Sequence, residues 1–247
     1  MPKANTVDES EEPVVVTLDS KDKEQFIETG IPEVDAIIGG GVYRGRITEV
    51  WGQEGVGKTN MIIRMLAHVS KNHKVLFVDS EFALNKERVK ELGADPKNIS
   101  YIADSRLERV AELLIEAVGK YDLIILDSLA YLTPTSVDTA TVGENAIGLF
   151  SRLIKHWVIK FRPRLGVSKT AFVAINQYRK PFGLYAKAEP VGGTSWHHAV
   201  DVRLHLTNNS SDKIMEGTQR VGHWVHVEVK KSKVSPPFVT TKYKLMY

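Results

Sequence analysis

The chain contains no cysteine among its 247 residues. Disulfide bonds, thiolate metal sites and cysteine nucleophiles are therefore excluded, and the composition suits a reducing compartment. Long hydrophobic runs are also missing, because the longest apolar runs are only as long as a strand, and the sequence predicts no membrane-spanning segment. The polar N-terminus lacks the apolar stretch of a secretory signal. These absences lead us to expect a cytoplasmic protein.

A strong excess of one charge is absent as well. The net charge is +3, so composition alone does not predict a nucleic-acid partner, and any basic surface must come from local clustering. The hydrophobic fraction of 43% is enough for a sizeable core. The length suits one α/β domain with at most a small appendage, and we find no internal repeat.

The first 25 residues differ from the rest. Residues 1–12 are polar and acidic, which predicts a disordered tail. Residues 13–18 form a short β-prone segment, and a lone strand needs a partner in its own sheet or in a neighbouring subunit. We therefore predict an acidic tail with a possible oligomerisation strand over 1–25, and a globular core over 26–247.

Strands and helices alternate through most of the core. The hydrophobic pattern predicts strands over 46–51, 74–79, 99–103, 123–127 and 171–175. It predicts helices over 60–67, 85–92, 106–118 and 145–161, and a turn into a short amphipathic helix over 29–38. Such alternation indicates an α/β fold with a mostly parallel sheet covered by helices on both faces. Strands over 202–206, 223–230 and 239–245 follow without helices between them, which predicts an antiparallel extension.

A glycine-rich motif lies between the first of these strands and its helix. Residues 52–59 read Gly-Gln-Glu-Gly-Val-Gly-Lys-Thr, which matches Gly-x-x-x-x-Gly-Lys-Thr in the strand–loop–helix context that the motif requires. Backbone N–H groups of such a loop close on phosphate, and the helix N-terminus adds further donors. Lys58 would reach the β- and γ-phosphates and Thr59 would hold Mg²⁺. The alternative is a chance glycine-rich turn. The predicted nucleotide-binding residues are Gly52, Gln53, Glu54, Gly55, Val56, Gly57, Lys58, Thr59 and Asn60.

Polar residues follow three other predicted strands at their carboxyl ends, where ligands bind in open α/β sheets. Asp127 can hold Mg²⁺ opposite Thr59, or else cap a helix. Glu81 can accept a proton from a water that attacks the γ-phosphate, or it is a solvated loop acid. Gln177 can donate to a γ-phosphate oxygen and couple nucleotide state to the following loop, or it is an ordinary polar strand end.

Two long segments, 133–143 and 178–194, lack a helix or strand pattern, and loops of this length are usually functional or disordered. The second interleaves cations with aromatic rings, which suits single-stranded nucleic acid, although a mobile lid is the alternative. Arg152 on the preceding helix, with Lys155 and Lys160, extends a basic track or forms a solvent face. The residues that we expect to bind nucleic acid are Arg152, Arg179, Lys180, Phe182, Tyr185, Lys187, Gly192 and Gly193.

Near the C-terminus, Lys231 and Lys233 share one face of a predicted strand. They suit contact with one anionic target, or they form a surface charge cluster. The eight histidines form no metal-binding signature, and we interpret them as structural or interfacial.

Taken in order, these segments resemble the RecA family of recombination ATPases over residues 26–247. The likeness rests on residues 29–35 before the phosphate loop, 79–84 around Glu81, 123–128 around Asp127, the Asn-Gln pair 176–177, 192–204 after the second loop, and 231–238. It implies that Glu81 is the catalytic base, that Gln177 senses the γ-phosphate, and that Lys231 and Lys233 act on a neighbour's nucleotide. It also implies that Arg152 contacts DNA and that Arg88 stacks on adenine.

The resemblance implies an ATP- and Mg²⁺-dependent enzyme, with a RecA-like core, that forms a helical filament on single-stranded DNA. ATP would lie between subunits, and homologous duplex DNA would be the second partner in pairing and strand exchange. The likeness includes neither the C-terminal domain of bacterial members nor an N-terminal helical DNA-binding domain, so we expect a bacteriophage-like or streamlined recombinase in a bacterial or phage-infected cell. His197 and His198 depart from the residue types of bacterial members. Two alternatives stay open: a paralogue that regulates a recombinase, and a hexameric nucleic-acid motor.

Overall fold

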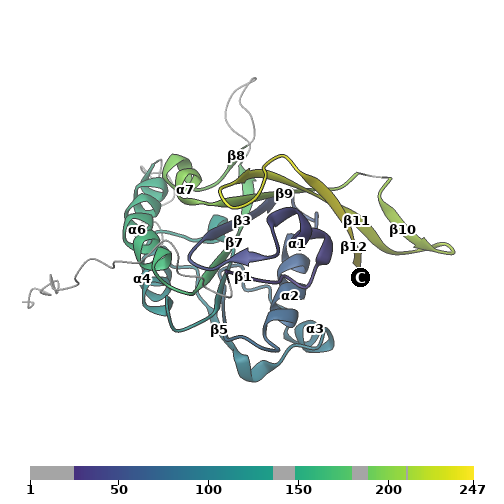
Figure 1. Ribbon diagram of the computed structural model, residues 1–247, viewed down its shortest axis with the longest axis horizontal. Helices are drawn as coiled ribbons and strands as arrows, with labels where there is room; N and C mark the ends of the chain where they lie inside the picture. Colours follow the sequence, from purple (N-terminus) through teal and green to yellow (C-terminus); the bar gives the residue numbers. More distant parts are fainter. Residues whose placement is uncertain (1–24, 136–147, 180–188, 210) are drawn as a thin grey trace, which may run out of the picture.

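A ten-stranded sheet forms the centre of the part of the chain that the computed structural model describes, which is residues 25–135, 148–179, 189–209 and 211–247. The predicted acidic tail and the strand over 13–18 lie outside this part, so the division at residue 25 stays a prediction. Figure 1 shows the sheet between two groups of helices.

Six neighbouring strands of this sheet are parallel to one another. In spatial order they are β9 (Val202–Thr207), β3 (Ile47–Gly52), β7 (Ala171–Arg179), β6 (Leu123–Asp127), β4 (Val75–Asp79) and β5 (Ile99–Ala103). Strands β4 and β6 are buried along their whole length, which explains their continuous apolar sequences. Because the strands are parallel, their carboxyl ends meet at one edge of the sheet.

The C-terminal strands extend the sheet in antiparallel fashion, as predicted. Strand β11 (Gln219–Ser232) pairs with β9 and with β12 (Thr240–Met246). It also pairs with β10 (Lys213–Glu216), and the resulting hairpin projects from the body in Figure 1. Strand β10 was not predicted, because none of its residues is buried and its sequence therefore carries no hydrophobic alternation.

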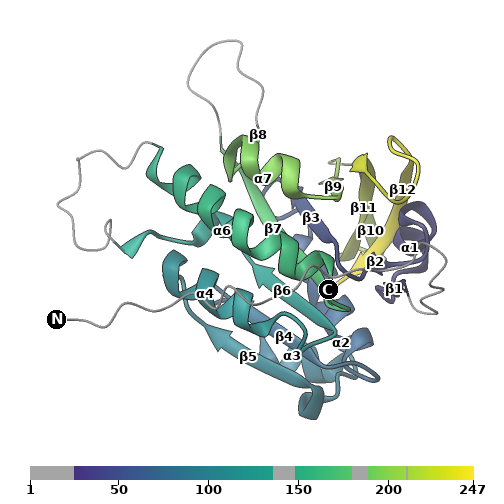
Figure 2. The same ribbon diagram turned by 60° about the vertical axis from the view of Figure 1, so that its left-hand side comes forward.

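Helices cover both faces of the parallel strands, as predicted (Figures 1 and 2). One hydrophobic core includes buried residues of α1 (Pro32–Ile38), α2 (Lys58–Val69) and α3 (Lys86–Glu91). The second core, on the other face, includes residues of α4 (Leu107–Ala117), α6 (Leu149–Gly166) and α7 (Gly193–Ala199). Short pieces complete the fold: β1 (Phe26–Ile27), β2 (Val42–Tyr43), β8 (Glu189–Pro190), and the 3₁₀ turns Pro96–Asn98 and Leu129–Tyr131.

Local sequence accounts for several helix boundaries. Helix α1 has Pro32 at its first position, where no intrahelical N–H bond is lost, and it ends at Gly39, which adopts the left-handed conformation (φ 87°). The side chain of Asn85 caps α3 by accepting the N–H of Arg88. In α4, the buried residues Leu107, Val110, Leu114 and Ala117 recur at the spacing of one helical face.

The structure corrects three expectations. Helix α6 continues past Pro163 to Gly166 instead of ending at 161, and the predicted start at 145 lies outside the described residues. Strand β7 runs on to Arg179, because Tyr178 and Arg179 pair with Pro190 and Glu189 of β8. The segment 178–194 is therefore not irregular at its ends, and helix α7, which begins inside it at Gly193, was not predicted.

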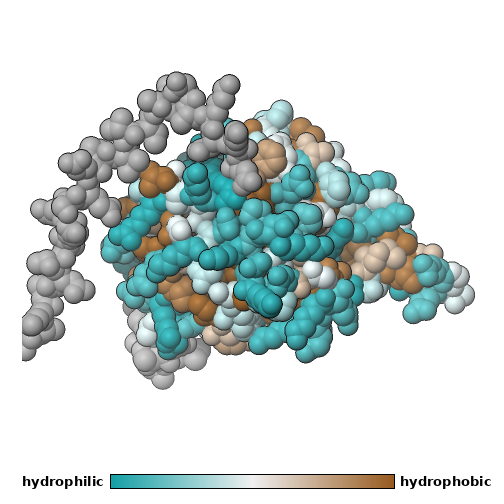
Figure 3. Space-filling model, turned by 60° about the horizontal axis from the view of Figure 1, so that its bottom comes forward, coloured by the Kyte–Doolittle hydropathy of each residue, from teal (hydrophilic) through white to brown (hydrophobic). Residues whose placement is uncertain are grey.

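No helix in the described ranges combines the length and the apolar character needed to cross a membrane. The face drawn in Figure 3 is mainly hydrophilic, and its hydrophobic side chains lie in separate groups.

Candidate functional site

The phosphate loop connects β3 to α2, as the motif predicted. Gly52 must be glycine, because a Cβ there would collide with the carbonyl oxygen of Leu206 on β9. Gly57 caps α2 in the left-handed conformation (φ 105°), where side chains are strained. Gln53, Glu54 and Gly55 are exposed at the tip of the loop, Val56 is buried, and Gly57, Thr59 and Asn60 are half-buried. The loop therefore presents its backbone to solvent at the carboxyl edge of the sheet.

Lys58 lies inside this loop. Its Nζ donates to the carbonyl oxygens of Gly52 (3.1 Å) and Gln53 (2.9 Å). Burial lowers the pKa of Lys58, while the negative charges of Glu81 and Asp127 act in the opposite direction. A buried ammonium group that donates to carbonyl oxygens alone, among the described residues, is well prepared to bind an anion.

Asp127 and Thr59 meet in space, although 68 positions separate them in the chain. Burial, followed by the negative charges of Glu81 and Asp79, raises the pKa of Asp127 to about 7. The neighbouring Thr59 hydroxyl acts to lower the pKa of the Asp127 carboxyl group. Its Oδ1 is buried and has no hydrogen-bond partner among the described residues. A buried carboxylate oxygen without a donor, next to a threonine hydroxyl, suits a Mg²⁺ ligand set of oxygens.

Glu81 is held in a loop that Asp79 organises. The carboxylate of Asp79 accepts the backbone N–H groups of Glu81 (3.1 Å) and Leu84 (3.0 Å) and the hydroxyl of Tyr101 (3.0 Å). Phe82 within this turn adopts a positive φ of 57°, which is rare for a bulky residue. The turn fixes where the side chain of Glu81 emerges from the end of β4.

The carboxylate of Glu81 contacts two residues from neighbouring strand ends. Its Oε1 accepts the hydroxyl of Ser128 (2.7 Å) and the amide Nε2 of Gln177 (3.0 Å). Ser128 follows Asp127, and Gln177 lies near the end of β7. The structure thus brings together the sequence-predicted residues Lys58, Thr59, Glu81, Asp127 and Gln177.

Lys231 and Lys233 lie elsewhere. Lys231 Nζ donates to the carbonyl oxygen of His197 (2.6 Å), and Lys233 Nζ lies 3.3 Å from Oδ1 of Asp201. Asp201 exchanges hydrogen bonds with Ile47, the first residue of β3, whereas the phosphate loop follows its last residue. Lys233 therefore lies near the first residue of β3, about 17 Å from the phosphate loop for a strand of this length. Lys231 pairs with Arg203 of β9, which is level with Glu49 in the middle of β3.

For the other residues with predicted roles, the structure gives no contact with the nucleotide site among the described residues, so their roles stay predictions. Arg88 pairs with Glu91 in α3 (3.3 Å), and Arg152 is exposed near the start of α6. Arg179 is the last residue of β7. Four residues of the expected nucleic-acid loop lie outside the described residues: Lys180, Phe182, Tyr185 and Lys187.

Gly192 and Gly193 begin α7 rather than an irregular loop. Gly192 caps the helix with φ 117°, and a Cβ there would come within 2.8 Å of Trp196. Their glycine character is explained by this turn, and a contact with DNA stays a prediction.

Two features were missed from the sequence. Glu49 in the middle of β3 is fully buried and accepts three side-chain hydrogen bonds, from Asn176, Trp196 and Arg203. An acid inside an otherwise apolar strand was a visible signal, since buried acids require partners. The second feature is His223, which lies 3.0 Å from the hydroxyl of Tyr247 and 3.4 Å from the carbonyl oxygen of Val56. No sequence pattern indicated that the last residue lies beside the phosphate loop.

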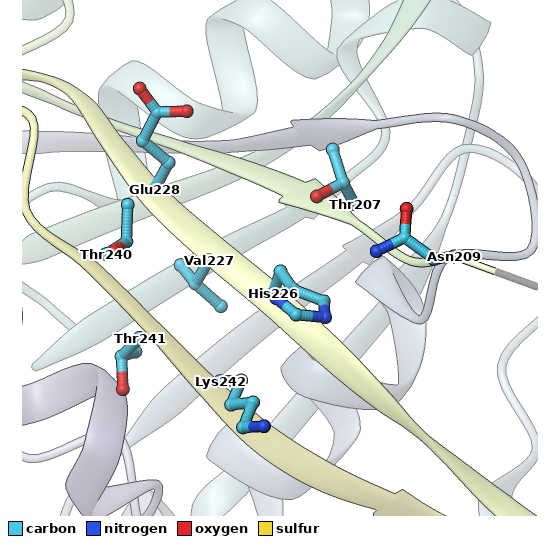
Figure 4. Close-up of a pocket in the computed structure, with 8 residues that line it drawn as sticks. All are labelled: Thr207, Asn209, His226, Val227, Glu228, Thr240, Thr241 and Lys242. Atoms are coloured by element: carbon cyan, nitrogen blue, oxygen red, sulfur yellow. The ribbon is translucent and has the colours of Figure 1, made fainter. Parts of the chain in front are cut away.

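A polar groove of about 530 Å³ lies on the antiparallel extension (Figure 4). None of its lining residues is among those predicted to bind nucleotide, metal or DNA, and His226 within it pairs with Asp212 (3.0 Å). The lining residues are Thr207, Asn209, His226, Val227, Glu228, Thr240, Thr241 and Lys242.

Comparison with known proteins identifies the family. Residues 10–247 match the model of the RecA N-terminal domain. The chain is 34% identical over 229 residues to Protein RecA of Streptomyces coelicolor, an alignment that covers 90% of this chain and 61% of that protein. It is 33% identical over 242 residues to Protein RecA of Helicobacter pylori strain P12, which covers 94% of this chain and 69% of that protein. The chain thus spans about three fifths of the length of its Streptomyces relatives. With this match and this geometry, the chain belongs to the RecA family.

Proposed function

We propose that this chain is an ATP-dependent recombinase that assembles into a helical filament on single-stranded DNA. It promotes homologous pairing and strand exchange, and DNA stimulates its hydrolysis of ATP. The observation that carries the proposal is the contact of Gln177 Nε2 with Glu81 Oε1 (3.0 Å) beside the phosphate loop. It joins the general-base candidate to the residue that leads into the expected DNA loop.

Glu81 is the base in this proposal. Both of its donors, Ser128 and Gln177, approach Oε1, which fixes the plane of the carboxylate. The second oxygen, Oε2, is then the one that orients an attacking water and accepts its proton. Gln177 would exchange its contact with Glu81 for one with a γ-phosphate oxygen when ATP binds.

The phosphate loop residues 52–60 hold the phosphates through backbone N–H groups, and Lys58 turns from loop carbonyls to phosphate oxygens. Thr59 and Asp127 are the residues that would hold Mg²⁺, which supplies charge neutralisation to the phosphate oxygens when bound. Asp127 would have to lose its proton to hold Mg²⁺, because a carboxyl group acts as a ligand in its ionised form.

Lys231 and Lys233 serve a neighbouring subunit in this account. Lys233 lies toward the end of β3 opposite the phosphate loop, and Lys231 is engaged at the end of α7. Both are partly exposed, which favours action on the nucleotide of a neighbouring subunit. In a head-to-tail filament, this end of one subunit faces the nucleotide of the next. ATP bridging two subunits then favours the filament, and hydrolysis weakens it.

Strand exchange between circular single-stranded DNA and a homologous linear duplex, with ATP and Mg²⁺, tests the proposal. We expect joint molecules that require homology and are absent for Lys58→Ala. A heterologous duplex is the matched DNA control. Binding of ATP and DNA without exchange would overturn the proposal in favour of a regulatory paralogue, and closed rings in electron micrographs would favour a motor.

A further inference from the structure

A carboxylate lies at the centre of the sheet, away from solvent. Glu49 is in β3, which lies between the parallel strands β9 and β7, and its exposure is 0%. A buried acid is costly unless donors satisfy it. Its Oε1 accepts Asn176 Nδ2 (2.8 Å) and Trp196 Nε1 (2.6 Å), and its Oε2 accepts Arg203 Nε (2.6 Å). Both oxygens are therefore engaged.

One of these donors leads directly to the nucleotide site. The Oδ1 atom of Asn176 accepts the backbone N–H of Gln177 (2.9 Å), and its Nδ2 also donates to the carbonyl oxygen of Val191 (2.6 Å). Gln177 in turn contacts Glu81. Two hydrogen bonds thus connect Glu49 to Gln177, and a third reaches the candidate base.

Another donor belongs to α7, the helix that begins where the segment 178–194 ends. Trp196 is fully buried and stacks on Trp157 of α6, with ring centroids 5.8 Å apart and planes 15° apart. Lys231 donates to the carbonyl oxygen of His197 in the last turn of the same helix. Helix α7 therefore contacts Glu49 on its buried side and a proposed trans-acting lysine at its end.

We propose that Glu49 is a positioning residue that ties α7 to the strand end carrying Gln177. Through this tie, a displacement of α7 changes the contact between Gln177 and Glu81. The inference rests on the proposed function, because it assigns to Glu49 the coupling of DNA binding to ATP hydrolysis. A close-packed core transmits such a displacement, and Trp196 is fully buried and stacked on Trp157.

The role of the Glu49 carboxylate can be tested by a substitution that keeps the size of the side chain. In Glu49→Gln, the side chain offers one acceptor oxygen and one NH₂ group. If the oxygen faces Asn176 and Trp196, the NH₂ group opposes Arg203; if it faces Arg203, the other two donors lose their acceptor. Trp196→Phe is a second variant, because it removes only the Nε1 donor and keeps a ring in the same place.

A matched control is available in Asp104→Asn. Asp104 is also a buried acid (7% exposed) at the end of a strand, and it pairs with Arg106 (2.7 Å) and Arg109 (3.3 Å). Asp104 follows β5, which is the edge strand of the parallel set and is separated from β3, the strand of Glu49, by β7, β6 and β4. It therefore reproduces the loss of a paired carboxylate without touching the proposed connection.

The experiment measures ATP hydrolysis of the full chain with and without oligo(dT), the Kd of a fluorescent ATP analogue, and the thermal unfolding midpoint. We expect Glu49→Gln and Trp196→Phe to reduce the ratio of DNA-stimulated to unstimulated kcat by about tenfold, with the Kd of the analogue changed by less than about threefold. Asp104→Asn should keep the ratio of the parent chain.

The outcomes distinguish a failure of the proposed function from a failure of the role assigned to Glu49. A parent chain without DNA stimulation would overturn the proposed function. A stimulated parent with unchanged ratios in both variants would overturn the role of Glu49 alone. A merely structural role predicts a lower unfolding midpoint with both rates reduced in proportion, and that result would also contradict the proposal.

Discussion

The side-chain amide of Gln177 donates to the carboxylate of Glu81 across 3.0 Å, although 96 positions separate them in the sequence. The contact joins the ends of β4 and β7, with the end of β6 between them. Through this contact, the candidate γ-phosphate sensor donates a hydrogen bond to a carboxylate oxygen of the candidate base. The predictions below follow from this arrangement and from the residues around it.

Replacement of Glu81 by Gln should separate ATP binding from ATP hydrolysis. The amide keeps the size of the side chain but accepts a proton poorly, and general-base catalysis contributes roughly 10²- to 10⁴-fold. We expect kcat to fall by at least about 10²-fold while the Kd of ATP stays within about threefold, so that filaments persist in electron micrographs. A variant with the turnover of the parent would show that Glu81 is not the base.

Several parts of this site could be predicted from the sequence because they depend on local order. The motif 52–59 needs only a strand before it and a helix after it. The residues Glu81, Asp127 and Gln177 each follow an apolar run, and parallel strands bring such ends to one edge. Their convergence is therefore a consequence of topology that the alternation of strands and helices already indicates.

Other features depend on contacts between distant segments and could not be predicted in this way. The partners of Glu49 come from three elements, so the sequence shows only that a buried acid needs donors. Helix α7 begins with two glycines and is seven residues long, too short for a hydrophobic period to be recognised. The location of Lys231 relative to the phosphate loop follows from the antiparallel path of β11, which strand patterns alone do not give.

The raised pKa of Asp127 predicts how stability depends on pH in the absence of Mg²⁺. Its pKa is about 7 in the folded chain, against 3.8 for an ordinary aspartate side chain. Between these values the folded state binds more protons than the unfolded state, so the free energy of unfolding should fall as pH rises from about 4 to about 7. The limiting slope is about 1.4 kcal/mol per pH unit for one proton.

The measurement is urea unfolding at several pH values for the parent chain and for Asp127→Asn. Because asparagine does not titrate, the free energy of unfolding of the variant should lack the fall with pH that Asp127 causes. The stability of the variant relative to the parent should therefore increase toward pH 7. Addition of Mg²⁺ with ATP should restore stability to the parent at neutral pH more than to the variant. Parallel pH profiles for the two chains would contradict the assignment.

The positions of Lys231 and Lys233 predict complementation between two defective chains. Lys231→Ala/Lys233→Ala should retain ATP binding but lose cooperative, DNA-stimulated hydrolysis. Lys58→Ala should lose hydrolysis while keeping both lysines. In mixed filaments, the intact lysines of one subunit meet the intact phosphate loop of the next, so the mixture should hydrolyse more ATP than the sum of the separate chains. Strictly additive rates would rule against action in trans.

Phosphate contacts predict a steep dependence of DNA affinity on salt. For single strands, the slope of log K against log salt concentration is about −0.7 for each neutralised phosphate. Arg152→Ala should reduce the magnitude of this slope by about 0.7, as one phosphate contact is lost. Arg164→Ala is the matched control, because it is exposed on the same helix about 18 Å farther along. Equal slopes for the parent and Arg152→Ala would remove this residue from the DNA site.

The most direct test of the account is the rate of ATP hydrolysis by the full chain with and without single-stranded DNA. We predict strong stimulation by oligo(dT), because Gln177 connects the candidate base to the segment that we propose binds DNA, and we predict none for Lys58→Ala. A rate that single-stranded DNA leaves unchanged, in a chain that still binds ATP, would contradict the coupling of the nucleotide site to DNA.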